Sequence, residues 1–277
     1  MEHANRRAEE YLARGFRDVD AAAVDKMARC LTYMDGLPEF QQYKTTVLEM
    51  MKPLPGSITA DLGCGLGFDV RRLAKLVGPE GRAIGVDASL TLLESARAAS
   101  ENFPTAAFIQ ADIQNLPFAN GFLHSCKTDR TLQHVERPDA VLGEIFRTVR
   151  PGGRVVCAEP DWGTFAIEAS SLGDTEHPVA RQLAQLWSQD IRNPRIGSDL
   201  RKLLVEAGFV DLQVKETVLS TPDFASGDIV FDLTQGALRL AASSGSEEPI
   251  AWLARLREQV NPVCCSVTLV IHFARRP

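Results

Sequence analysis

The chain has 277 residues, 45% of them hydrophobic and 24% charged, which is typical of a globular protein with one substantial core. A net charge of −6 and a pI near 5.5 argue against nucleic-acid partners, because phosphate contacts need a basic surface. No stretch approaches the ~20 apolar residues of a membrane span, and the N-terminus lacks an apolar signal core, so we expect no membrane span and a cytoplasmic protein.

The cysteines and histidines give no sign of a metal site. The six cysteines are scattered, with no Cys-x-x-Cys pair and no Cys/His cluster at zinc spacing. We therefore expect reduced thiols in the core and no bound metal.

From Pro55 onward, short β-branched runs alternate with longer helical patterns, the order typical of a parallel sheet covered on both faces. The predicted strands are residues 58–63, 82–87, 106–112, 123–128, 154–159, 210–216 and 264–274. The predicted helices are residues 69–77, 89–100, 138–149 and 200–207. Pro151, Gly152 and Gly153 predict a turn before the fifth strand.

Three segments are longer than this repeat requires: 1–54, 160–198 and 220–260. Such long connections usually carry structure and function of their own, and we expect all three to be mainly helical. The predicted organisation is a helical cap over 1–54 and a main domain over 55–277 that contains the other two segments as insertions. Together they would roof a substrate cavity.

An acid stands directly before three alternating glycines where the first strand turns into its helix, in the run Asp61-Leu-Gly-Cys-Gly-Leu-Gly67. Glycines permit close approach of a ligand to the backbone, and the helix N-terminus offers free N–H groups. Dinucleotide enzymes use a similar loop, usually spaced G-x-G-x-x-G, and a plain surface turn is a further alternative.

Two more acids end the next strands. Asp87 closes the second strand, where an acid can accept both ribose hydroxyls of an adenosine cofactor. Asp112 closes the third, where it can accept from the adenine amino group while Ile113 packs on the ring. Each acid alone could be a helix cap, but jointly they surround one crevice at a sheet edge.

The runs DLGCGLG, GVDAS, ADIQNLPF, TDRTLQHV and RTVRPGGRVVCAEPDW resemble the successive signatures of class I S-adenosylmethionine (SAM)-dependent methyltransferases. The resemblance spans about residues 43–216 and is strongest to the ubiquinone/menaquinone-biosynthesis-like (type 11) group found in bacterial natural-product pathways. It implies a doubly wound α/β, Rossmann-like fold with a seven-stranded, mostly parallel sheet and an antiparallel last strand. It also implies SAM as cofactor.

The resemblance assigns cofactor contacts residue by residue. Asp61 and the loop backbone at Gly63, Cys64 and Gly65 would orient the methionine end. Asp87 with Ala88, and Asp112 with Ile113, would hold the ribose and the adenine. The backbone at Thr128 and Asp129 resembles the segment that contacts the methionine amino group. Gln133 and His134 replace the common His-His pair of the family, and His124 replaces its usual aspartate.

His134 is the first candidate for a general base, since it follows the fourth strand on the ligand edge. The alternative is a histidine packed on its helix. Glu159 and Asp161, after the fifth strand, are further candidates for catalysis or could cap the next helix. Tyr33 and Tyr43 could close over the cofactor, while Trp162, Phe165 and Trp187 could line an apolar pocket or pack in a core.

The predicted function is methylation of a small, fairly apolar organic acceptor, secondary-metabolite or quinone-like. Two alternatives remain open: a SAM-binding cyclase or scaffold without net methyl transfer, and a nicotinamide-dependent oxidoreductase, which lacks its usual glycine spacing here. The acceptor, the methylated atom and the oligomeric state, a homo-oligomer included, are not fixed by the sequence.

Overall fold

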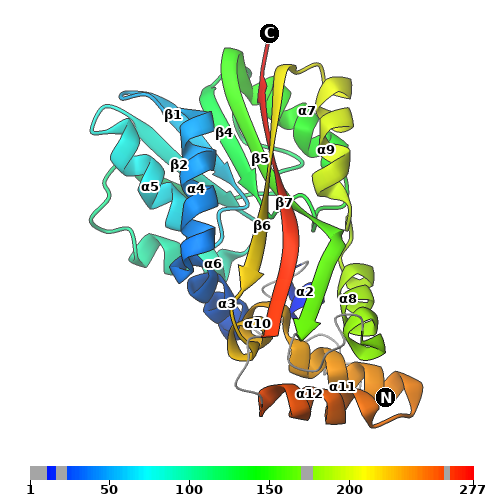
Figure 1. The fold of residues 1–277 in the computed structure, drawn as a ribbon. Helices are drawn as coiled ribbons and strands as arrows, with labels where there is room; N and C mark the ends of the chain where they lie inside the picture. The colour runs from blue at the N-terminus through cyan, green and yellow to red at the C-terminus, as the bar shows by residue number, and fades with distance from the viewer. Residues whose placement is uncertain (1–10, 17–23, 170–176, 259–262) are drawn as a thin grey trace. The chain divides into compact units, whose positions relative to one another are not determined.

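The computed structural model describes residues 11–16, 24–169, 177–258 and 263–277. Its centre is a seven-stranded sheet with the strand order β3-β2-β1-β4-β5-β7-β6 (Figure 1). The strands are β1 (Ile58–Leu62), β2 (Arg82–Asp87), β3 (Ala106–Gln110), β4 (Leu123–Asp129), β5 (Val149–Ala169), β6 (Val210–Thr221) and β7 (Val263–Arg275).

Helices occupy most of the remaining described chain. They are α2 (Leu12–Gly15), α3 (Val24–Gly36), α4 (Pro38–Met51), α5 (Phe68–Val77), α6 (Leu90–Ala98), α7 (Pro138–Thr148), α8 (Pro178–Asp190), α9 (Ile196–Glu206), α10 (Phe224–Phe231), α11 (Leu233–Ser244) and α12 (Glu248–Arg257). Within the described ranges, no helix has the length and apolar character needed to cross a membrane.

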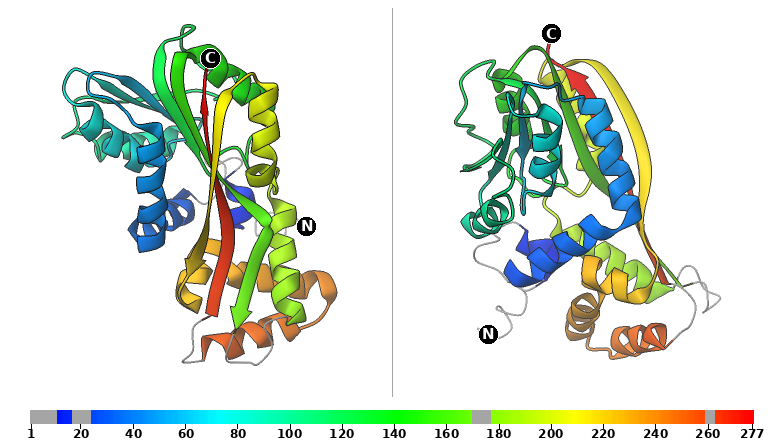
Figure 2. Two further views of the ribbon diagram at one scale, coloured as in Figure 1. Left: turned by 45° about the horizontal axis from the view of Figure 1, so that its top comes forward. Right: turned by 90° about the vertical axis from the view of Figure 1, so that its left-hand side faces the viewer.

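The sheet is parallel in its first five strands: β1 pairs with β2 and β4, β2 with β3, and β4 with β5. Strand β7 runs the other way. Gly152, early in β5, donates its N–H to Arg276 just beyond β7, whereas Thr164, late in β5, accepts from Thr268 in β7. Strand β7 is therefore antiparallel to β5. The strand order at this edge of the sheet is β5, β7 and β6 (Figure 2). The predicted α/β fold with its mostly parallel sheet is confirmed.

The chain divides into two compact units. Unit 1 comprises the described parts of 1–40, 161–194 and 218–268, and unit 2 comprises 41–160, 195–217 and 269–277. The strands β5, β6 and β7 contribute residues to both units.

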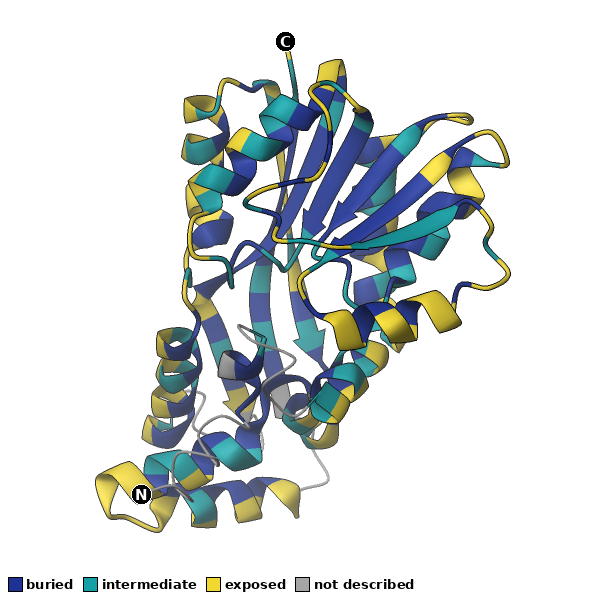
Figure 3. Cartoon of the chain, turned by 180° about the vertical axis from the view of Figure 1, so that it is seen from behind, coloured by how far each residue is buried: buried dark blue, intermediate teal, exposed yellow. Residues whose placement is uncertain are grey.

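The core of unit 2 follows from the alternation of side chains along each strand. Ala60, Leu62 and Val86 lie on one face and share a buried cluster with Val141 of α7 and Leu200 of α9. Ala60, Leu62 and Val86 are all apolar and buried, and most residues of the central strands are buried as well (Figure 3). The intervening residues face α5 and α4, so the helices cover both faces of the sheet.

The long fifth strand contradicts one prediction. Residues 160–169 were expected to begin a helical insertion, but they continue β5 to Ala169. Phe165 and Ile167 are buried at a spacing of two, which is the period of a strand and not of a helix. The Pro160 and Gly163 nearby obscure this pattern in the sequence.

The predicted turn at 151–153 is also wrong, because these residues lie inside β5. Gly152 has a φ of 75°, and the register between β4 and β5 shifts between Leu123 and Ser125. The three residues therefore form an irregularity within the strand, where one strand bends without leaving the sheet. The helices predicted for 220–260 are confirmed as α10, α11 and α12.

Candidate functional site

The glycine loop of unit 2 connects the end of β1 to α5 and is fastened to the end of β2. The N–H groups of Gly63 and Cys64 donate to the carbonyl oxygen of Val86, at 2.7 and 3.1 Å. The Gly65 N–H donates to Asp87 Oδ2 at 2.8 Å, and Asp87 Oδ1 accepts from the Ser89 N–H at 2.9 Å. The structure thus brings the loop and the second predicted acid together.

The backbone here leaves no room for side chains at two glycines. Gly63 has a φ of 79°, and a Cβ on it would overlap the side chain of Thr131, which follows β4. Gly85 lies on β2, where a Cβ would come within 2.7 Å of Cys64 Sγ, 2.8 Å of Val70 and 2.9 Å of Phe108. The absence of side chains here therefore allows the loop to pack against Thr131 and β2 to pack against Cys64, Val70 and Phe108.

The topology places Asp61, Asp87 and Asp112 at the carboxyl ends of β1, β2 and β3, three adjacent strands. Asp112 is exposed, and its Oδ1 accepts from the Gln114 N–H at 2.8 Å. Ile113 is 6% exposed and belongs to the core cluster of unit 2. The order β2-β1-β4 also makes the β1/β4 boundary the place where the strand order reverses, the usual ligand position in such sheets.

The segment after β4 carries a dense set of charged contacts. Asp129 accepts from the Tyr43 hydroxyl at 3.0 Å, from Lys44 Nζ at 3.0 Å and from Arg130 Nε at 3.2 Å. Burial alone would raise the pKa of Asp129, but Lys44, Lys127 and Arg130 hold it well below its ordinary value. Arg130 has a φ of 53°, a conformation that side-chain-bearing residues rarely adopt and that often marks functional segments.

Glu159 lies within β5, one residue after Ala158, which pairs with Asp129 at the end of β4, and it is fully buried. Its Oε1 accepts from the N–H groups of Thr131 and Leu132 at 2.9 and 2.8 Å, and its Oε2 from that of Gln133 at 3.4 Å. Burial raises the pKa of Glu159 to about 8, although these three donors act in the opposite direction. The carboxyl group therefore holds the backbone that follows β4.

The other two catalytic candidates lie in different units. His134 is half-buried in unit 2, and its backbone N–H donates to Thr131 O at 3.0 Å. Asp161 belongs to unit 1, is 6% exposed, and its Oδ1 accepts from the Gly163 N–H at 2.9 Å. Tyr43 contacts Asp129, whereas Tyr33 of unit 1 bonds Ser226 at 2.6 Å.

Sequence reasoning missed three buried charges in unit 2: Lys44, Asp69 and Lys127. Lys127 lies among the buried residues of β4, and Asp69 stands in the first turn of α5 after the glycine loop. A lysine inside a buried strand was the available signal, because lysine is almost never fully buried without a partner.

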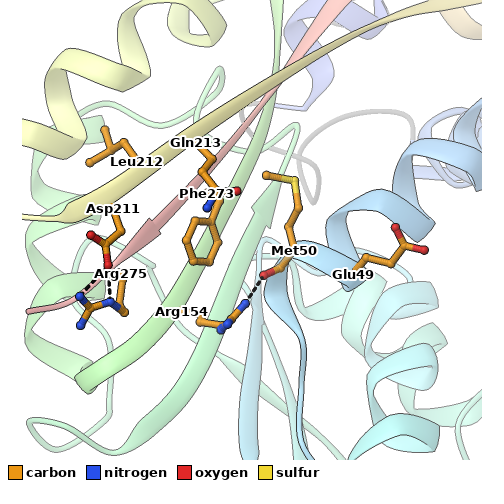
Figure 4. A pocket seen from close by; sticks show the side chains of 8 residues that line it. All are labelled: Glu49, Met50, Arg154, Asp211, Leu212, Gln213, Phe273 and Arg275. Atoms are coloured by element: carbon orange, nitrogen blue, oxygen red, sulfur yellow. Dashed lines mark hydrogen bonds and ion pairs between the residues drawn. The ribbon is translucent and has the colours of Figure 1, made fainter.

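An open cavity of about 700 Å³ in unit 2 contains none of the predicted site residues. It is lined by Glu49, Met50, Arg154, Asp211, Leu212, Gln213, Phe273 and Arg275 (Figure 4). Its guanidinium groups are engaged: Arg154 donates to Met50 O at 3.2 Å, and Arg275 pairs with Asp211 at 2.6 Å. Arg154 lies in the first part of β5, so the cavity is separate from the glycine loop at the carboxyl end of β1.

Comparison with known proteins shows which family the chain belongs to. The sequence profile described as "Methyltransferase domain" matches residues 55–208, more than half of the chain. A protein of Streptomyces fradiae described as an uncharacterized 37.1 kDa protein in transposon TN4556 is 35% identical over 251 residues, covering 88% of this chain and 71% of that protein.

Two further similarities agree with this match. Demethylmenaquinone methyltransferase of Lactococcus lactis subsp. lactis is 31% identical over 178 residues, covering 62% of this chain and 66% of that enzyme. The fold is similar to the crystal structure of a candidate methyltransferase from Bacillus halodurans C-125, with a TM-score of 0.61 and 19% identity, covering 84% of this chain and 98% of the other.

The chain belongs to the methyltransferase domain family. Within it, the chain is a class I SAM-dependent methyltransferase of the ubiquinone/menaquinone-like group, and SAM is its cofactor. The predictions of family, enzyme class and cofactor are thereby confirmed, and the oxidoreductase alternative is set aside.

Proposed function

We propose that this methyltransferase acts on a small, fairly apolar organic acceptor of a secondary-metabolite or quinone-like kind. The observation that carries the proposal is an aromatic cluster within unit 1, formed by Tyr11, Trp162, Phe165, Trp187 and Phe231, each at most 8% exposed. Trp187 is its centre, with ring centroids 5.5 Å from Tyr11 and Trp162, 5.7 Å from Phe231 and 6.2 Å from Phe165.

Such a cluster supports an apolar, ring-containing acceptor, because aromatic faces and edges pack favourably on other rings. The Trp187 indole Nε1 is buried and has no hydrogen-bond partner among the described residues. A donor in this position supports an acceptor that carries an oxygen. The name of the Lactococcus lactis relative, which is 31% identical, also supports a quinone-like compound.

For the cofactor we propose the contacts expected from the sequence. Asp61 and the backbone at Gly63, Cys64 and Gly65 orient the methionine end, together with the backbone at Thr128 and Asp129. The ribose lies against Asp87 and Ala88, and the adenine against Asp112 and Ile113. The fastening of Gly65 to Asp87 and the tight backbone at Gly63 support this arrangement.

SAM supplies a methyl group on a sulfonium, which is transferred in line to the acceptor nucleophile with release of S-adenosylhomocysteine. Positioning and exclusion of water can supply much of the rate. We propose His134 as the base that takes a proton from the acceptor. Glu159 acts through the backbone of Thr131 and Leu132 and not on the acceptor, and its three donors support this positioning role. For Asp161 we propose a contact with the acceptor.

The proposal also gives the two units separate roles. The three segments predicted to exceed the repeat, 1–54, 160–198 and 220–260, overlap largely with unit 1, which also holds the aromatic cluster. This overlap supports acceptor recognition by unit 1, with cofactor binding assigned to unit 2.

The test measures S-adenosylhomocysteine release from SAM with four acceptor classes: a demethylated naphthoquinol, a phenolic polyketide, a short peptide and an oligonucleotide. We expect release with the first two classes and only background with the others, as the net charge of −6 also suggests for the oligonucleotide. Efficient methylation of the peptide or the oligonucleotide would overturn the proposal. Conversion of an acceptor without S-adenosylhomocysteine release would instead favour a cyclase.

A further inference from the structure

Five charged side chains form a buried network within unit 2: Lys44, Asp61, Asp69, Lys127 and Asp129, which we call the charge network. Their side chains are between 1% and 8% exposed. Lys127 Nζ lies 2.6 Å from Asp69 Oδ2, 3.2 Å from Asp61 Oδ1 and 3.5 Å from Asp129 Oδ2. Lys44 Nζ lies 2.7 Å from Asp69 Oδ2 and 3.0 Å from Asp129 Oδ2.

The strand register explains why Lys127 meets Asp61. The two residues are register partners on the parallel strands β4 and β1, so their side chains project from the same face of the sheet. This is the face covered by α5, whose first turn supplies Asp69. Asp69 thus holds the ammonium group of Lys127 beside Asp61.

The three carboxylates of the charge network differ in how many cations they contact. Asp69 is within 2.7 Å of Lys44, Lys127 and Arg72, and Asp129 is within 3.5 Å of Lys44, Lys127 and Arg130. For Asp61, the ion pair found in the described chain is the one with Lys127. Loss of Lys127 would therefore remove the direct counter-charge of Asp61 while leaving two cations beside each of the others.

A buried carboxylate remains ionised only when nearby charges or donors compensate for its lost hydration. Burial raises the pKa of Asp61 to about 6, and Lys127 is the strongest influence that opposes this rise. The groups that act on Asp61 or that it acts on are Lys44 of α4, Asp69 of α5, Cys126, Lys127 and Asp129 of β4, and Cys64 of the glycine loop.

We infer that Lys127 is a positioning residue for cofactor binding, which keeps Asp61 ionised and in place to orient the methionine ammonium group of SAM. This inference rests on the proposed contact between Asp61 and the methionine end. Lys127 itself needs no contact with the cofactor in this role, and Asp69 serves to fix its ammonium group. No function could be assigned to Lys127 from the sequence. Its ion pair with Asp61 now suggests one.

The experiment measures the dissociation constant of S-adenosylhomocysteine by calorimetry between about pH 6 and pH 8, for the wild type, Asp61→Asn, Lys127→Met, Lys44→Met and Asp61→Asn/Lys127→Met. Thermal unfolding of each variant identifies those that fold. Lys44→Met is the matched comparison, because Lys44 is buried in the same network but leaves the Asp61–Lys127 pair intact.

We expect Lys127→Met to bind S-adenosylhomocysteine increasingly weakly as the pH falls, since Asp61 without its counter-ion takes up a proton at a higher pH. Each unit by which the pKa of Asp61 exceeds the pH lowers its ionised fraction about tenfold. Lys44→Met should shift the pH dependence less than Lys127→Met does, because Lys44 acts on Asp61 more weakly than Lys127 does. The double variant should bind as Asp61→Asn does and should unfold at a higher temperature than Lys127→Met, because it buries no unpaired carboxylate.

Three results separate the possible failures. If Asp61→Asn binds as tightly as the wild type, the proposed cofactor contact of Asp61 is wrong. If Asp61→Asn binds weakly but Lys127→Met loses affinity equally at every pH, the cofactor contact stands and the positioning role of Lys127 is overturned. If Lys127→Met fails to fold, the double variant decides: affinity equal to that of Asp61→Asn supports the coupling, and markedly weaker binding than that of Asp61→Asn refutes it.

Discussion

Gly63 of the glycine loop lies so close to Thr131, after β4, that a single added methyl group would overlap the threonine side chain. Gly63→Ala should therefore displace either the loop or the chain after β4, in addition to straining a backbone with a φ of 79°. We expect affinity for S-adenosylhomocysteine to fall at least tenfold, about 1.4 kcal/mol. Calorimetry measures this loss.

Gly56→Ala separates backbone strain from overlap, because Gly56 has a similar φ of 76° and nothing within 4 Å of an added Cβ. It should lower the free energy of unfolding by about 1 kcal/mol and leave cofactor affinity unchanged. Equal losses of affinity in both variants would mean that the Gly63–Thr131 contact has no part in binding.

Asp87→Ala removes two hydrogen bonds at the end of β2, to the N–H groups of Gly65 and Ser89. A charged hydrogen bond is worth about 1.5–3 kcal/mol, so loss of the proposed ribose contact and a loosened loop should weaken S-adenosylhomocysteine binding roughly 10- to 100-fold. Asp139→Ala, at an aspartate whose side chain is 57% exposed, should bind as the wild type does. Unchanged affinity in Asp87→Ala would contradict the assigned crevice.

Glu159 should make the stability of the protein depend on pH. Its pKa is about 8 in the native state against 4.5 ordinarily, so the native state retains a proton that the unfolded state has lost between these values. This contribution to stability is complete below about pH 4.5 and disappears as the pH rises through about 8, a change on the order of a few kcal/mol. Denaturant unfolding of the wild type and Glu159→Gln across this range measures it as the difference between the two curves.

Glu159→Gln should lack this slope and keep an acceptor for the Thr131 and Leu132 N–H groups, whereas Glu159→Ala leaves three buried donors without partners. We expect Glu159→Ala to lose about 3 kcal/mol or more. A slope that persists in Glu159→Gln would assign the titration to another group.

Trp187 should carry much of the stability of unit 1, since its ring contacts four other aromatic side chains. Trp187→Ala should cost about 3–5 kcal/mol of unfolding free energy, and Trp187→Phe considerably less. If Nε1 also bonds the acceptor, Trp187→Phe should raise KM for an oxygen-bearing acceptor while leaving cofactor affinity unchanged. Near-wild-type stability of Trp187→Ala would remove the aromatic cluster from the core of this unit.

The sequence predicted the repeating part of the fold well, because buried parallel strands are continuous apolar runs bounded by turn residues. The predicted strand Arg82–Asp87 has the bounds of β2, and the range 264–274 differs from β7 by one residue at each end. The prediction from the sequence was wrong at 160–169. There Pro160 and Gly163 obscure the strand pattern, and pairing with β7 extends β5. Strand length here is decided by a partner about a hundred residues away.

The charge network could not be predicted from spacing alone. Lys44, Asp69 and Lys127 are separated by 25 and 58 residues, and each has an ordinary surface role when considered singly. The glycine loop and the acids after β1, β2 and β3 were accessible to sequence reasoning because their positions follow from the strand ends. A counter-ion such as Lys127 becomes evident only when the register of β1 and β4 is known.

Gly85 has a consequence for how this chain can change in evolution. Three side chains, Cys64, Val70 and Phe108, already fill the space that its own side chain would need. A lineage that gains alanine here must shrink those neighbours as well, so the four positions should vary together. Val70 and Phe108, which lie outside the glycine loop, are in this way tied to it through Cys64.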